Sequence, residues 1–101
     1  ELHTFSSLNA DFLKEYKGAL NAADKAVVYF SPEALQNKKL APITEEQIFN
    51  AFDRKDLEVY TNPENFQDFL KQQHYEETVL LLMSSGTYGG LDFNQISEWI
   101  K

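Results

Sequence analysis

The stretch Thr78-Val79-Leu80-Leu81-Leu82-Met83-Ser84-Ser85-Gly86-Thr87-Tyr88-Gly89-Gly90 decides the fold class. Its first six residues are the most hydrophobic segment of the chain and predict a central β-strand covered on both faces. The small residues at 84–90 predict the loop that leaves the carboxyl end of that strand. A closing helix is predicted over 91–101, with Phe93, Ile96, Trp99 and Ile100 on its apolar face.

Before this stretch, segments whose apolar residues recur at helical spacing alternate with segments that have the apolar pattern of a strand. Helices are predicted after the cap residue Asn9, from the capping box Thr44-Glu45-Glu46-Gln47, and from Asn62-Pro63. Strands are predicted over 26–30 and 57–60, and a long connection over 33–43. Alternating strands and helices predict an α/β fold, namely a three-layer Rossmann-like domain with a mostly parallel sheet flanked by helices.

Composition narrows the possible functions. The 101 residues fit one domain, and the absence of cysteine excludes disulfides, thiolate metal sites and cysteine catalysis. The net charge of −7 disfavours nucleic acid as a partner because such a surface repels phosphate backbones. The longest apolar run, 79–83, is too short to cross a membrane. The two distant histidines form no metal-ligand pattern, so no metal site is predicted.

Two segments are candidate ligand sites because ligands of open α/β sheets bind beyond the carboxyl ends of the strands. The first is the loop Ser84, Ser85, Gly86, Thr87, Tyr88, Gly89 and Gly90, whose backbone N–H groups suit a carboxylate or phosphate. It is neither a P-loop nor a dinucleotide fingerprint. The same glycines also fit a tight strand-to-helix turn without a ligand.

The second candidate segment is 2–7, which offers the imidazole of His3 and the hydroxyls of Thr4, Ser6 and Ser7 between a strand end and a helix. The hydroxyls equally suit helix capping, and His3 equally suits a structural role. A strand is expected to precede the first helix, and only residues 1–5 remain to supply it. We therefore expect residues 1–101 to be one domain of a larger protein, truncated at its N-terminus.

These segments resemble the Mur ligases. Residues 79–91 are similar to the final strand of the family's C-terminal domain and its Met-Ser-Asn/Ser-Gly-x-Phe/Tyr-Gly-Gly-Ile/Leu loop, and residues 1–8 and 22–28 resemble earlier parts of the same domain. The chain most resembles the murein peptide ligases, which recycle peptides, and next the UDP-N-acetylmuramate–L-alanine ligases. Tyr88-Gly89-Gly90 favours the first group, because the L-alanine ligases usually have a shorter Met-Gly-Ala-Gly-Asp loop there.

The resemblance implies the third domain of a cytoplasmic enzyme of peptidoglycan synthesis or recycling, which shapes the cell wall. Such a ligase uses ATP and Mg²⁺ to activate the carboxylate of UDP-N-acetylmuramate and joins it to a peptide or to L-alanine. The substrate-binding residues that the resemblance implies are His3, Thr4, Ser6, Ser84, Ser85, Gly86, Thr87, Tyr88, Gly89 and Gly90.

The phosphate loop, the magnesium-binding acid and histidine, and the active-site lysine of the family are absent from this sequence. The resemblance therefore assigns ATP and Mg²⁺ to preceding domains of the same polypeptide, no cofactor to this chain, and no catalytic residue to it. The chain alone is predicted to be inactive. The alternative to the ligase interpretation is a free-standing Rossmann-like module that binds a ligand or partner without catalysis.

Overall fold

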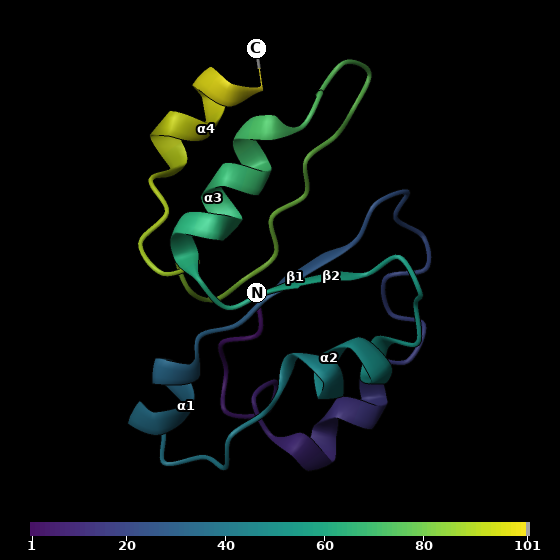
Figure 1. Ribbon diagram of the computed structural model, residues 1–101, viewed down its shortest axis with the longest axis vertical. Helices are drawn as coiled ribbons and strands as arrows, with labels where there is room; N and C mark the ends of the chain where they lie inside the picture. Colours follow the sequence, from purple (N-terminus) through teal and green to yellow (C-terminus); the bar gives the residue numbers. More distant parts are fainter. Residues whose placement is uncertain (101) are drawn as a thin grey trace.

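A computed structural model describes residues 1–100 and shows a mixed α/β domain built around two parallel strands (Figure 1). Strands β1 (Val27–Tyr29) and β2 (Glu58–Tyr60) pair in the register Val27 with Glu58 and Tyr29 with Tyr60. Leu2 forms a parallel bridge to Phe30, beyond the end of β1. The two predicted strands are confirmed, each slightly shorter than expected.

Local sequence signals explain where the helices begin. The capping box predicted at Thr44 is present at the start of α2 (Glu45–Phe52), where Thr44 and Gln47 bond each other's backbone N–H groups. Asn62 caps α3 (Pro63–Gln72) with proline at the first helical position, as predicted. The closing helix α4 (Phe93–Trp99) is also present, and Lys101 lies outside the described residues.

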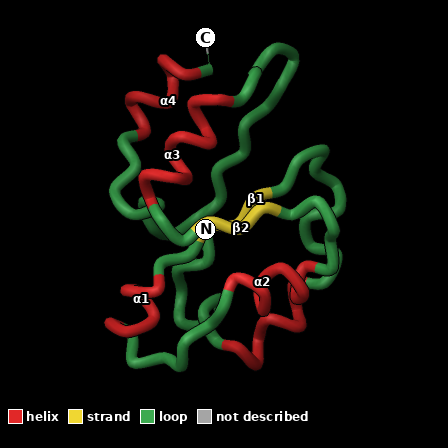
Figure 2. The backbone as a smooth tube through the Cα atoms, in the orientation of Figure 1, coloured by secondary structure: helices red, strands yellow, loops and turns green. Residues whose placement is uncertain are grey.

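Three predictions of secondary structure need correction. The helix after Asn9 is the 3-10 helix η1 (Ala10–Tyr16). The predicted connection over 33–43 contains a helix, α1 (Pro32–Asn37), because Ser31 caps it and Pro32 fits its first turn. Residues 78–83 are not a strand: they pair with no strand of the described chain and run as an irregular segment, drawn green in Figure 2.

The helices lie on both sides of the two strands, and side chains of alternating strand residues divide into two clusters (Figure 1). Val28 and Phe30 pack with η1, α1 and α2 in the first cluster. Tyr29 packs with α3, α4 and the 84–91 loop in the second cluster, where Phe66 and Tyr88 stack with ring centroids 5.3 Å apart. The alternation places each β1 side chain on one face or the other. The sheet of the described chain has two strands. The sequence predicts a sheet with more strands than this, flanked by helices in three layers.

Candidate functional site

A surface cleft of about 430 Å³ lies where the N-terminal segment, the start of α1 and the 84–90 loop meet. The cleft is lined by Glu1, His3, Ser31, Glu33, Ala34, Asn37, Gly86, Thr87, Gly89 and Gly90. Both segments singled out by the sequence therefore contribute to one cleft, although 76 residues lie between them along the chain.

The end of strand β1 positions His3 and Ser31 at the cleft. The bridge from Leu2 to Phe30 fixes the neighbouring His3, and Ser31 follows Phe30 directly as the cap of α1. The cleft thus lies beyond the carboxyl end of β1. That is the edge at which ligands of parallel α/β sheets bind.

The carboxylate of Glu1 is the centre of the polar contacts in the cleft. Its side chain is only 2% exposed. The Ser84 hydroxyl donates to Glu1 Oε1 at 2.5 Å, and the backbone N–H of Tyr88 donates to the same oxygen at 3.1 Å. The Ser84 hydroxyl in turn accepts the Gly86 N–H at 2.7 Å. The loop does bind a carboxylate, and that carboxylate belongs to the chain itself.

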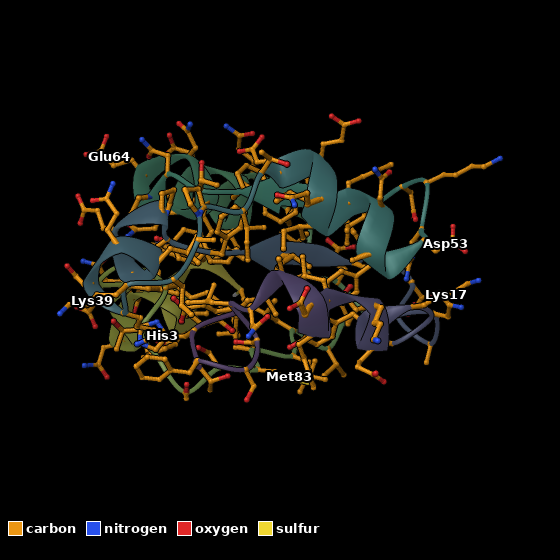
Figure 3. The ribbon with its side chains drawn as sticks, turned by 90° about the horizontal axis from the view of Figure 1, so that it is seen from below. His3, Lys17, Lys39, Asp53, Glu64 and Met83 are labelled. Carbon is orange, nitrogen blue, oxygen red and sulfur yellow. The ribbon has the colours of Figure 1, made fainter. Side chains whose placement is uncertain are left out.

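His3 lies beside this carboxylate without a hydrogen bond to it. Its Nδ1 is 3.8 Å from Glu1 Oε2, which is too long for a hydrogen bond, and it is buried with no partner among the described residues. A buried polar atom without a partner is unfavourable, so the imidazole retains an unused hydrogen-bonding group at the cleft. In the view of Figure 3, the labelled His3 projects from the N-terminal segment toward the outside of the molecule.

The glycines of the loop are required by different contacts. A Cβ at Gly86 would lie 2.7 Å from Glu1 Oε1 and 2.8 Å from His3 Cγ, so glycine allows the loop to approach both side chains. Gly89 has a φ of +74°, and a Cβ there would lie 2.6 Å from both Pro63 Cγ and the Tyr29 hydroxyl. The tight-turn interpretation of these glycines therefore has direct structural support, alongside their position at the cleft.

Several predicted site residues do not line the cleft. Thr4 donates its hydroxyl hydrogen to Ser7 Oγ at 2.9 Å and accepts the Ser7 N–H at 3.1 Å, so it closes a local turn. Ser6 and Ser85 are exposed outside the cleft. Tyr88 is buried in the second cluster, and its hydroxyl donates to the Met83 carbonyl at 3.1 Å.

Some of the loop amides are already bonded within the chain. The N–H groups of Gly86, Tyr88, Gly90 and Leu91 all donate to acceptors within the chain, the last two to the Thr87 carbonyl. These four amides are thus not free for a ligand carboxylate. The sequence interpretation missed Glu1 and the residues in and next to α1 that line the cleft, namely Ser31, Glu33, Ala34 and Asn37. The Ser31-Pro32 helix signal would have placed Glu33 in the first turn of a helix.

Burial and the Glu1 charge shift the pKa of neighbouring groups. Burial raises the pKa of the Tyr29 and Tyr88 phenols, and the negative charge of Glu1 raises both further. Burial lowers the pKa of the Glu1 amino group, with the Glu1 carboxylate acting in the opposite direction. Two acidic side chains, those of Glu1 and Glu33, line the cleft.

No family model, curated protein or solved structure matched this chain. Among residues 1–100, no group of three His, Asp or Glu side chains is placed to hold a metal ion. Within the same residues, every helix is too short or too polar to span a membrane.

Proposed function

We propose that this chain is the C-terminal, substrate-side domain of a Mur-type ligase, with a Rossmann-like sheet larger than the two strands described. The observation that carries the proposal is the meeting of His3 with Gly86, Thr87, Gly89 and Gly90 around one cleft. These residues belong to the two segments on which the resemblance to the family is strongest. Their convergence beyond the end of a parallel strand is the arrangement that a substrate-binding edge requires.

The charges of the cleft favour a particular end of the incoming substrate. The Glu1 carboxylate already has two donors, whereas Glu33 at the start of α1 is exposed. Carboxylates at a cleft attract ammonium groups and repel other carboxylates. We therefore assign the cleft to the amine-bearing end of a peptide or amino acid, with His3 as an additional hydrogen-bonding partner. This assignment is made in addition to the expectation that loop amides position the peptide or its carboxylates.

The proposal places ATP, Mg²⁺ and UDP-N-acetylmuramate on preceding domains of a longer polypeptide. In such an enzyme, closure of this domain would bring the amine toward the activated carboxylate and exclude water. The chain's own residues would orient the amine, and none of them is assigned as catalytic.

A binding titration tests the assignment with the chain as it stands. We expect L-alanyl-γ-D-glutamyl-meso-diaminopimelate to shift the backbone NMR signals of Gly86, Thr87, Gly89 and Gly90 at millimolar concentration. The same peptide acetylated at its L-alanine nitrogen should cause smaller shifts because it lacks that ammonium group. Glu33→Gln should weaken binding several-fold, whereas Glu46→Gln, outside the cleft on α2, should not. Equal shifts from both peptides would refute the assigned orientation.

Ligase activity requires a separate measurement. We expect ATP-dependent amide formation from the longer polypeptide that contains this chain and its preceding domains, and none from the 101 residues alone. Comparing turnover with the tripeptide and with free L-alanine would identify the amine substrate. Turnover by the isolated chain, or no ligase activity from the longer polypeptide, would overturn the proposal.

A further inference from the structure

The charges that line the cleft match only one end of a peptide. The lining includes the acidic side chains of Glu1 and Glu33 and no lysine or arginine. A peptide that presents its amine there also carries at least one carboxylate, which such a lining repels. A cation at the border of the cleft would therefore complete its charge complementarity.

Lys38 is a cation at that border. Helix α1 presents Ala34 and Asn37 to the cleft. The helical backbone continues to Lys38, whose N–H donates to the Ala34 carbonyl at 3.0 Å. Residues four apart lie on the same face of a helix, so Lys38 shares the face of Ala34. Lys38 therefore extends the cleft-facing side of α1 by one turn.

A contact with Phe5 holds the Lys38 side chain toward the N-terminal segment. The Lys38 Nζ lies 5.0 Å from the centroid of the Phe5 ring, in a cation–π contact. Phe5 is 63% exposed and lies two residues beyond His3, which lines the cleft. The Lys38 side chain thus spans from α1 to the N-terminal segment, the two parts of the chain that flank the cleft.

The Lys38 ammonium has no carboxylate partner among the described residues. The residue is half-buried, and the ion pairs within residues 1–100 are made by His3, Lys25 and Arg54 instead. An ammonium group binds carboxylates through short, charge-assisted hydrogen bonds. Lys38 therefore retains the capacity to bind a carboxylate that a ligand brings to the cleft.

We propose that Lys38 binds the carboxylate on the second residue of the incoming peptide while Glu33 binds its amine, an inference that rests on the proposed function. An α-helix rises about 1.5 Å per residue, so the backbone positions of residues 33 and 38 are about 7.5 Å apart along its axis. An extended peptide advances about 3.5 Å per residue, so its first amine and the carboxylate on its second residue are separated by about 7 Å.

The same spacing makes Lys38 a specificity-determining residue. A free amino acid carries its amine and carboxylate on one residue, and its length of about 3.5 Å is too short to reach Glu33 and Lys38 together. The pair of side chains therefore selects a peptide over free L-alanine.

NMR titrations of the 101-residue chain test this role of Lys38. The probes are L-alanyl-γ-D-glutamyl-meso-diaminopimelate and the same tripeptide with a carboxamide in place of the α-carboxylate of its D-glutamyl residue. Lys38→Gln should weaken binding of the first peptide about threefold to fivefold, as expected for a partly exposed ion pair, and leave the Kd of the carboxamide peptide unchanged. The unsubstituted chain should bind the carboxamide peptide as weakly as Lys38→Gln binds the first peptide.

Two further variants separate charge at this position from charge in general. Lys38→Arg keeps the positive charge and should retain most of the affinity for the first peptide. Lys17→Gln removes one positive charge at the far end of the molecule from His3 and should change neither Kd (Figure 3).

Equal losses of affinity for the two peptides in Lys38→Gln would overturn the inference, because Lys38 would then act only on the structure of the cleft. Unchanged binding of both peptides by Lys38→Gln, or binding of free L-alanine as tightly as the tripeptide, would also overturn it. These results would leave the proposed function standing, since the unsubstituted chain would still bind the tripeptide. No binding of the tripeptide by the unsubstituted chain would overturn both proposals.

Discussion

Substitution of Gly89 by alanine should destabilise this domain more than the same substitution at Gly18. Both glycines have nearly equal positive φ angles, +74° at Gly89 and +78° at Gly18. An L-residue in this region costs about 1–2 kcal/mol, so this part of the penalty is shared. At Gly89 the new Cβ also meets Pro63 Cγ and the Tyr29 hydroxyl at 2.6 Å, whereas at Gly18 its nearest neighbour is the Asn21 side-chain amide at 3.3 Å.

Crowding in a packed site costs about 1–3 kcal/mol. We therefore expect a loss of roughly 2–5 kcal/mol in the free energy of unfolding for Gly89→Ala, from strain and crowding together. For Gly18→Ala we expect about 1–2 kcal/mol from strain alone. Urea unfolding followed by circular dichroism measures both. Equal losses for the two variants would refute the steric argument, and a loss below about 0.5 kcal/mol at Gly89 would refute the strain argument as well.

Three further predictions concern the cap of α2, the hydroxyl of Tyr88 and the terminal amine of Glu1. Thr44→Ala removes one half of the capping box and should cost about 1 kcal/mol in urea unfolding, while Gln47→Ala should cost less because the Thr44 hydroxyl still accepts the N–H at position 47. Tyr88→Phe deletes the hydroxyl that donates to Met83 and should cost about 0.5–1.5 kcal/mol; an unchanged urea midpoint would show that this bond is not made in solution. Because the pKa of the Glu1 amine is lowered from 8.0 in the folded state, the unfolded state binds more protons, so stability should rise with pH through the region just below 8. Acetylation of that amine should remove this part of the pH dependence, and an identical pH profile for the acetylated chain would contradict the assignment.

Local signals in the sequence predicted the starts of α2 and α3 correctly. Thr44 with Gln47 and Asn62 with Pro63 act within one helical turn, so their geometry follows from neighbouring residues alone. The same chemistry at Ser31-Pro32 begins α1, most of which lies in the segment 33–43 that the sequence predicts as a connection. The evidence for that helix was present, and its short length of six residues left little periodic pattern to support it.

The 78–83 segment shows where local reasoning fails. Its hydrophobicity predicts a strand, but a strand also needs a hydrogen-bonding neighbour, and the described structure has no strand there. Leu80 and Leu82 pack against the second cluster. In the described chain, the backbone of the segment is bonded only at its two ends, where the Thr78 N–H donates to the Tyr75 carbonyl and the Met83 carbonyl accepts from the Glu1 amine and the Tyr88 hydroxyl. The amino-acid composition of a segment does not predict whether it pairs, because pairing depends on which other segment lies alongside it in the fold.

The sequence by itself determined the α/β class, the two parallel strands, the helix caps and the position of the glycine loop, because these depend on local periodicity and turn chemistry. Only the tertiary structure decided what the loop contacts. It brought His3 to Gly86 across more than 80 residues through the Leu2–Phe30 bridge, and it directed the Ser84 hydroxyl and the Tyr88 N–H to the chain's own Glu1. It also placed the Tyr88 ring in the core and Glu33 at the cleft. Such long-range contacts depend on the packing of whole elements, which no local pattern of residues records.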